Sequence, residues 1–253
     1  LFAAGCGGSS SKTSSDSAKS SQVFTNTNWA ELDSSPDKFK GSSVEVLGKV
    51  FIDPKTTGFQ MYANPKDSGF NTIVYFNDPN LSIKKGDFVK VTGIVKGAFS
   101  GENAFGAKLS APSITASAVQ VIDGKDVLAP TILKIEPKQS KNQHGLSITL
   151  DSVEFAKEET RLYITVFNGS TNKASFYSFN AKATQNGSQY SDQSNYDIKY
   201  PEVQSEILPN VTSHGVVVLA PMNVDAKAAQ FYLEGGTDNY RLDFDPYVFN
   251  VTW

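Results

Sequence analysis

The stretch Lys85-Gly86-Asp87-Phe88-Val89-Lys90-Val91-Thr92-Gly93-Ile94-Val95 decides the fold of the first half of this chain. It opens with a turn in which Gly86 suits a positive φ, and it continues as a strand that alternates apolar and polar residues. Gly93 interrupts that strand, as glycine does where a barrel strand must bend sharply. An earlier run, Val44 to Ile52, repeats the pattern with Gly48 in the middle.

Three further strands accompany these two, over residues 58–62, 71–76 and 112–122. A short helix is expected to begin after Asn28 and to turn Trp29 and Leu32 inward. Five strands within about 95 residues, two of them interrupted by glycine, are typical of a small closed barrel. The sequence therefore predicts a barrel over residues 26–122.

The same residues resemble the OB-fold family. Phe39-Lys40-Gly41, the run from Val44 to Val50, and the later Lys-Gly-Asp-x-Val-x-Val-x-Gly at Lys85 to Gly93 carry this resemblance. It covers roughly residues 28–122 and implies a five-stranded barrel. OB-folds bind nucleic acids, sugars and proteins, so the resemblance does not select a ligand.

Three aromatic residues, Phe59, Tyr62 and Tyr75, lie on the strands where a ligand would stack on an OB-like barrel. The alternative for each is packing in the core or across the strands. Residues 24–122 contain ten Lys and no Arg against nine Asp and Glu, a charge near +1. Because single-strand binders need a basic groove, we expect no nucleic-acid partner. Oligosaccharide binding on this face stays open.

The second half of the chain alternates in the same way, and its strongest strand pattern runs from Arg161 to Phe167. Turn signals follow at Asn168-Gly169 and Asn186-Gly187. About seven short strands with regularly spaced turns predict an immunoglobulin-like sandwich. Further strands are expected over residues 145–150, 175–183, 213–221, 231–233, 241–244 and 247–251.

Three segments of this half resemble the telokin-like domain of unknown function that is common in Gram-positive lipoproteins. They run from Leu162 to Asn168, from Gly187 to Tyr190, and from Leu208 to Pro221. The resemblance spans about residues 141–253 and implies a fold and an extracytoplasmic location, with little chemistry. Residues 123–140, stiffened by Pro130 and Pro137, are expected to link the two domains.

The beginning of the sequence, Leu1-Phe2-Ala3-Ala4-Gly5-Cys6, contains the only cysteine. It resembles the bacterial lipoprotein box, although Ala3 stands where that family usually has Leu. The resemblance implies a diacylglyceryl group on Cys6 that holds the chain on the outer face of the cytoplasmic membrane. We expect residues 1–25 to be a signal-peptide remnant, lipobox and flexible Gly/Ser-rich tether, with the front of the signal peptide missing. The alternative is a free thiol in a disordered tail.

Composition places the whole chain in the all-β class. It has 253 residues, 17 Phe and 10 Tyr among them, and no long helical periodicity. One cysteine cannot form an intramolecular disulfide, so stability must come from packing. The net charge of −3 indicates no general affinity for anionic surfaces.

Catalytic and metal-binding patterns are weak. His144 and His214 are the only histidines, and no Gly-x-Ser-x-Gly elbow occurs. Asp238, Asp243 and Asp245 are close in sequence but lack the spacing of an EF-hand calcium loop. We therefore expect no catalytic residues, no metal and no cofactor.

The resulting hypothesis is a non-catalytic, lipid-anchored, extracytoplasmic binding protein with a protein or a cell-wall glycan as its partner. Residues 141–253 carry eight Lys and Arg against thirteen Asp and Glu, near −5, which favours a basic partner for that domain. Two alternatives remain open: an envelope enzyme or accessory with a carboxylate-based site, and oligosaccharide or nucleic-acid binding on the barrel face.

Overall fold

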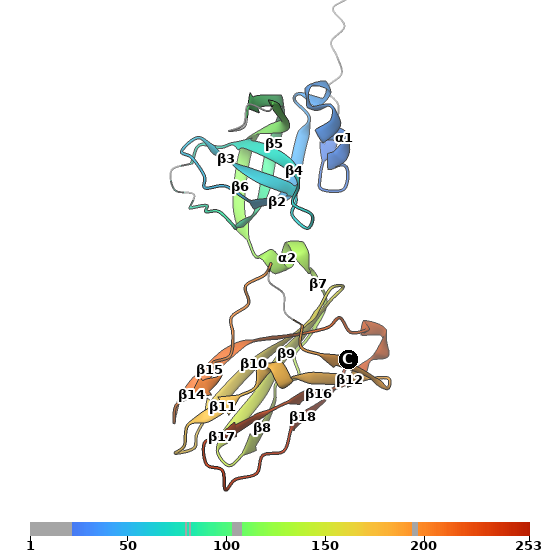
Figure 1. Cartoon of the computed structure of the whole chain (residues 1–253). Helices are drawn as coiled ribbons and strands as arrows, with labels where there is room; N and C mark the ends of the chain where they lie inside the picture. Colours follow the sequence, from blue (N-terminus) through green and yellow to red (C-terminus); the bar gives the residue numbers. More distant parts are fainter. Residues whose placement is uncertain (1–21, 79, 81, 103–107, 194–196) are drawn as a thin grey trace, which may run out of the picture. The chain divides into compact units, whose positions relative to one another are not determined.

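The structure, a computed structural model, describes residues 22–78, 80, 82–102, 108–193 and 197–253. Cys6 and most of the expected tether lie outside the described residues. The chain divides into two compact units between Val121 and Ile122, and Figure 1 shows that both consist mainly of strands. The predicted all-β class is confirmed. Within the described residues, no helix has the length and apolar character needed to cross a membrane.

The first unit contains five barrel strands: β2 (Ser43–Val50), β3 (Gly58–Asn64), β4 (Gly69–Tyr75), β5 (Phe88–Glu102) and β6 (Lys108–Ile122). They pair in the ring order β2, β3, β4, β6, β5 and back to β2, so the sheet is closed. The β4–β6 pair is parallel, whereas β2 is antiparallel to both β3 and β5. The predicted small OB-like barrel is confirmed.

Alternation along the strands builds the barrel core. Val44, Val46 and Val50 of β2 are buried, whereas Glu45, Leu47 and Lys49 face outward. Gly93 of β5 lies against β6, where an added Cβ would come within 2.3 Å of the Thr115 carbonyl oxygen. Only glycine permits this close approach of the two backbones.

Three short elements pack against the barrel core: β1 (Val23–Phe24), α1 (Trp29–Ser34) and the 3-10 turn η1 (Pro36–Phe39). Trp29 and Leu32 are fully buried, as predicted. Asn28 precedes the helix, but its side chain accepts a hydrogen bond from the Thr25 N–H at 2.7 Å and from no helix N–H. Its side chain therefore fastens the preceding turn to the start of the helix.

The second unit contains more and shorter elements than the predicted seven strands. They are α2 (Gly124–Leu128), β7 (Thr131–Ile135), β8 (Gln139–Gln143), β9 (Leu146–Ala156), β10 (Thr160–Asn168), β11 (Ala174–Phe176), η2 (Ser178–Asn180), β12 (Lys182–Gln185), β13 (Ser188–Ser191), β14 (Glu206–Ile207), β15 (Thr212–Leu219), η3 (Val224–Ala226), β16 (Ala228–Leu233), β17 (Gly235–Thr237) and β18 (Tyr247–Thr252).

These strands form the predicted immunoglobulin-like sandwich. One sheet has the order β15-β10-β9-β7, with β8 also paired to β9. The others have the orders β13-β12-β16-β18 and β14-β11-β17. Leu150 and Ile164 from the first sheet share one buried core with Phe231 and Phe249 from the second.

Three expectations for this unit are corrected by the structure. Residues 241–244, expected as a strand, form a turn and an irregular segment between β17 and β18. Residues 123–140, expected as a linker, contain α2, β7 and the beginning of β8, and both strands pair with β9. Leu133 and Ile135 pack against the core, which explains why this stretch is ordered as sheet. The expected strand over 175–183 is broken by η2, because the chain turns at Ser178 and leaves Phe179 70% exposed.

Candidate ligand-binding site

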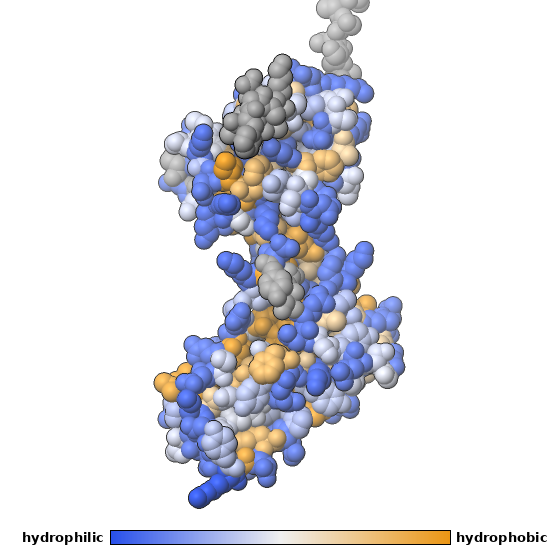
Figure 2. Space-filling view, viewed as in Figure 1, coloured by the Kyte–Doolittle hydropathy of each residue, from blue (hydrophilic) through white to orange (hydrophobic). Residues whose placement is uncertain are grey.

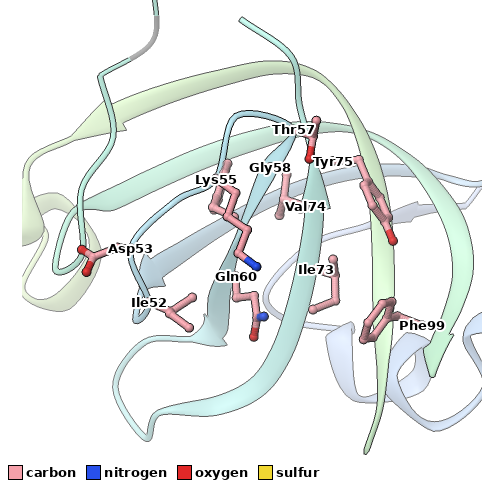
Figure 3. A pocket seen from close by; sticks show the side chains of 11 residues that line it. Ile52, Asp53, Lys55, Thr57, Gly58, Gln60, Ile73, Val74, Tyr75 and Phe99 are labelled. Atoms are coloured by element: carbon pink, nitrogen blue, oxygen red, sulfur yellow. The ribbon is translucent and has the colours of Figure 1, made fainter. Parts of the chain in front are cut away.

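A pocket of about 330 Å³ lies on the outer face of β3 and β4 in the first unit. Figure 3 shows its walls. Apolar side chains come from Ile52, Ile73, Tyr75 and Phe99, and polar ones come from Asp53, Lys55, Thr57 and Gln60.

Strand register explains how the pocket forms. Phe59 and Val74 point into the barrel, so their neighbours Gln60, Ile73 and Tyr75 face outward. Gln60 stands opposite Ile73, and Gly58 stands opposite Tyr75. A Cβ on Gly58 would come within 2.1 Å of the Val74 carbonyl oxygen, so glycine is required here.

Figure 3 shows how the polar and apolar groups are distributed. The Lys55 amine and the Gln60 amide point into the space between Ile52 and Ile73, while Tyr75 and Phe99 form the wall on the other side. Figure 2 shows apolar surface on the first unit over the region of β3 and β4. Ile52 is 45% exposed and Phe99 is 36% exposed, so apolar area is open to a ligand.

The structure separates the three aromatic residues predicted for this face. Tyr75 lines the pocket. Phe59 also borders it but is only 6% exposed and packs in the barrel core. Tyr62 is not among the lining residues; its ring stacks on Phe51, with centroids 4.1 Å apart and planes at 19°.

Two lysines and one aspartate lie in or beside the pocket. The Lys96 ammonium lies 3.8 Å from the centroid of the Tyr75 ring, within the range of a cation–π interaction. Lys55 and Asp53 are the charged residues of the lining itself.

A second hollow, of about 620 Å³, lies in the second unit along β15. Two acidic residues, Asp192 and Glu202, line it together with Lys199 and Tyr200. Burial raises the pKa of the Asp192 carboxyl above its ordinary value.

The two histidines do not form a nucleophilic triad. His214 Nδ1 lies 2.8 Å from Thr165 Oγ1, and that hydroxyl donates to Asp151 Oδ2 at 2.6 Å. The hydroxyl therefore stands between the carboxylate and the imidazole, whereas an activated nucleophile needs the imidazole in the middle. His144 Nε2 contacts the backbone oxygen of Asp243 at 3.0 Å.

Among the described residues, no three His, Cys, Asp or Glu side chains are grouped so as to hold a metal ion. Asp238, Asp243 and Asp245 do not form such a group. The backbone of Asp245 instead exchanges hydrogen bonds with the side chain of Gln143, at 2.8 Å and 2.9 Å.

A buried charged cluster in the second unit was not predicted. Arg161 is fully buried and donates to Glu159 at 2.8 Å, to Glu154 at 3.1 Å and to the Ala129 carbonyl at 2.8 Å. Burial alone would lower the pKa of Arg161, but hydrogen bonds to Glu159 and Tyr200 outweigh it and raise that pKa.

Two tyrosines complete the cluster. Burial raises the pKa of Tyr163 to about 12, with a further contribution from Glu154. Burial and a hydrogen bond to Glu159 raise the pKa of Tyr200. Both hydroxyls stay protonated at neutral pH and donate to carboxylates. The cluster thus joins the end of α2 to β9 and β10.

Comparison with known proteins adds little to this geometry. No protein-family model matches the chain, and no curated protein matches it. Among solved structures, the chain is similar to the crystal structure of a functionally unknown protein from Listeria monocytogenes EGD-e. That likeness has 10% identity and a TM-score of 0.39, and it covers 52% of this chain and 92% of the other. Neither value supports transferring a function.

Proposed function

We propose that this chain is a non-catalytic binding protein whose OB-like barrel holds a saccharide in the pocket over β3 and β4. The pocket itself is the observation that carries the proposal: an exposed, mostly apolar hollow with a few polar groups directed into it. Small-molecule sites have this composition. The strands around it occupy the position at which OB-folds receive oligosaccharides.

The chemistry of a sugar ring suits these walls. Its C–H face is apolar and packs on aromatic rings such as Tyr75 and Phe99. Its hydroxyl groups need donors and acceptors, which the Gln60 amide and the Thr57 hydroxyl supply. Nucleic acid is a weaker fit because the barrel has no arginine and a charge near +1.

The location remains part of the proposal and depends on the sequence alone. A lipid on Cys6, followed by a flexible tether, would hold the barrel on the outer face of a Gram-positive membrane, near cell-wall glycan. The resemblance of residues 141–253 to the telokin-like domain of lipoproteins supports the same location. Two acyl chains anchor a protein far more firmly than one, at roughly 0.8 kcal/mol for each buried methylene.

The anchor is tested by Cys6→Ser in the native host. We expect the variant to appear in the culture medium, because serine cannot accept the thioether-linked lipid, while the parent chain remains with the membrane fraction. Ser9→Ala is the matched control for a change in the same segment. Retention of Cys6→Ser in the membrane fraction would contradict the anchor.

The binding site is tested by Tyr75→Ala and Phe99→Ala. We expect each to weaken binding of the strongest glycan-array ligand at least about fivefold, since loss of a central aromatic anchor costs roughly 1–2 kcal/mol or more. Tyr62→Ala is the control, because Tyr62 is an aromatic residue of β3 outside the pocket. Titration calorimetry measures the three affinities. An array without any saccharide signal, or equal losses for Tyr62→Ala and Tyr75→Ala, would refute the site.

A further inference from the structure

Lys55 is held at the pocket by a tight turn between β2 and β3. Its N–H donates to the Gly58 carbonyl at 2.9 Å, and the Gly58 N–H donates back to the Lys55 carbonyl at 3.1 Å. These two bonds fix the backbone from which the side chain enters the pocket. Figure 3 shows its amine beside the Gln60 amide. The Lys55 side chain itself is exposed, so its ammonium is open to an anionic ligand.

Lys96 places a second positive charge at the same wall. Its ammonium packs on the Tyr75 ring at 3.8 Å from the centroid. Tyr75 in turn faces the pocket. Lys96 lies outside the lining, so a ligand stacked on this wall would lie near the Lys55 ammonium in the lining and near the Lys96 ammonium that packs on Tyr75.

Neither lysine is neutralised within the part of the chain that the structure describes. Lys40 pairs with Asp37 at 2.9 Å and Lys90 pairs with Glu45 at 2.6 Å. No corresponding ion pair with an acidic side chain is found among those residues for Lys55 or Lys96. Asp53 is the one acidic residue in the lining, so two lysines against one aspartate leave the site with a charge near +1.

We infer that the pocket takes an acidic saccharide, one that places a carboxylate or phosphate beside Lys55 and Lys96 while its ring packs on Tyr75 and Phe99. The inference rests on the proposed saccharide site and names the class of its ligand. A neutral sugar would leave both ammonium groups without a counter-charge. An anionic substituent supplies that charge, and the attraction weakens as salt is added.

The test uses the full chain and titration calorimetry with four probes. A galacturonate hexamer carries carboxylates, and its methyl ester is the uncharged counterpart. A phosphodiester-linked saccharide hexamer carries phosphates, and a single-stranded DNA dodecamer represents nucleic acid. We expect at least one acidic saccharide to bind about tenfold or more tightly than the methyl ester. We also expect that advantage to fall between about 0.05 and 0.5 M salt. The stronger of the two acidic probes identifies the anionic group.

The responsible residues are tested by Lys55→Gln and Lys96→Gln. Each exchange should weaken binding of the acidic saccharide about fivefold, the effect of one unit charge at about 4 Å in water, and should leave the methyl ester unchanged. Lys90→Gln is the control, because Lys90 lies outside the pocket lining and its ammonium is paired with Glu45, whereas that of Lys96 packs on the lining residue Tyr75.

The outcomes separate the inference from the proposed function. Equal affinity for the acidic hexamers and the methyl ester overturns the inference and leaves a saccharide site. A loss in Lys90→Gln as large as in Lys55→Gln also overturns the inference alone. Tighter binding of the DNA, or binding of none of the saccharides, overturns both.

Discussion

Replacing Arg161 with methionine should lower the free energy of unfolding of the second unit by about 3–5 kcal/mol. Arg161 is fully buried and is bonded to two carboxylates and to the Ala129 carbonyl. Methionine fills a similar volume but leaves Glu159, which is also fully buried, without the positive charge of Arg161. Removing one partner of a buried ion pair destabilises the fold far more than replacing both partners, because the remaining charge is left without an opposite charge.

The measurement is urea unfolding followed by tryptophan fluorescence. The chain has two tryptophans, Trp29 in the first unit and Trp253 in the second. Trp29→Phe therefore leaves Trp253 as the reporter of the second unit. Arg241→Met is the matched control, because that arginine is exposed and its loss should change stability by no more than about 0.5 kcal/mol.

A double exchange sharpens the result. Adding Glu159→Gln to Arg161→Met removes the orphaned charge, so part of the lost stability should return. If the free energy of unfolding of the single Arg161→Met variant lies within about 1 kcal/mol of the parent value, Arg161 is not part of the buried ion pair described above.

Phe24→Ala is expected to have a similarly large effect on the first unit, about 3–5 kcal/mol. Phe24 is fully buried and meets Phe39 edge to face, with ring centroids 4.8 Å apart. Its removal leaves a cavity beside Trp29 and Leu32 that rigid strands cannot fill. In a Trp253→Phe background, Trp29 reports unfolding of the barrel.

Val23→Ala is the control on the same short strand, since Val23 is 50% exposed. Its effect should remain below about 1 kcal/mol. Comparable losses for Val23→Ala and Phe24→Ala would contradict the burial of Phe24 in the barrel core.

The barrel could be predicted because the patterns that specify its strands lie in short stretches of sequence. Alternating valines and the mid-strand glycines Gly48 and Gly93 are visible in short windows of sequence. The two-residue strand at Phe24 could not be predicted, because two residues carry no periodicity. The Arg161 cluster was missed for another reason: its partners come from residues 129 to 200, and only the folded chain brings them together.

Only part of the candidate site could be predicted: Tyr75 was expected on this face, whereas Lys55 and Phe99 were not. Tyr75 faces outward on an expected strand, but register decides its neighbours. Tyr62 stands opposite Asn71, farther along the strand pair than the Gly58–Tyr75 pair, and therefore misses the pocket. Lys55 lies in a turn, and Phe99 extends β5 well beyond the predicted strand end at Val95. Neither position carries a signal that points to a ligand.

The most direct test of a saccharide site on β3 and β4 is a ¹⁵N-HSQC titration of the full chain with the acidic hexamer that binds most tightly. We expect saturable chemical-shift changes at the amides of Gln60, Ile73 and Tyr75, with the amides of the second unit unchanged. Shifts confined to the second unit, or an unaltered spectrum at saturating saccharide, would contradict it.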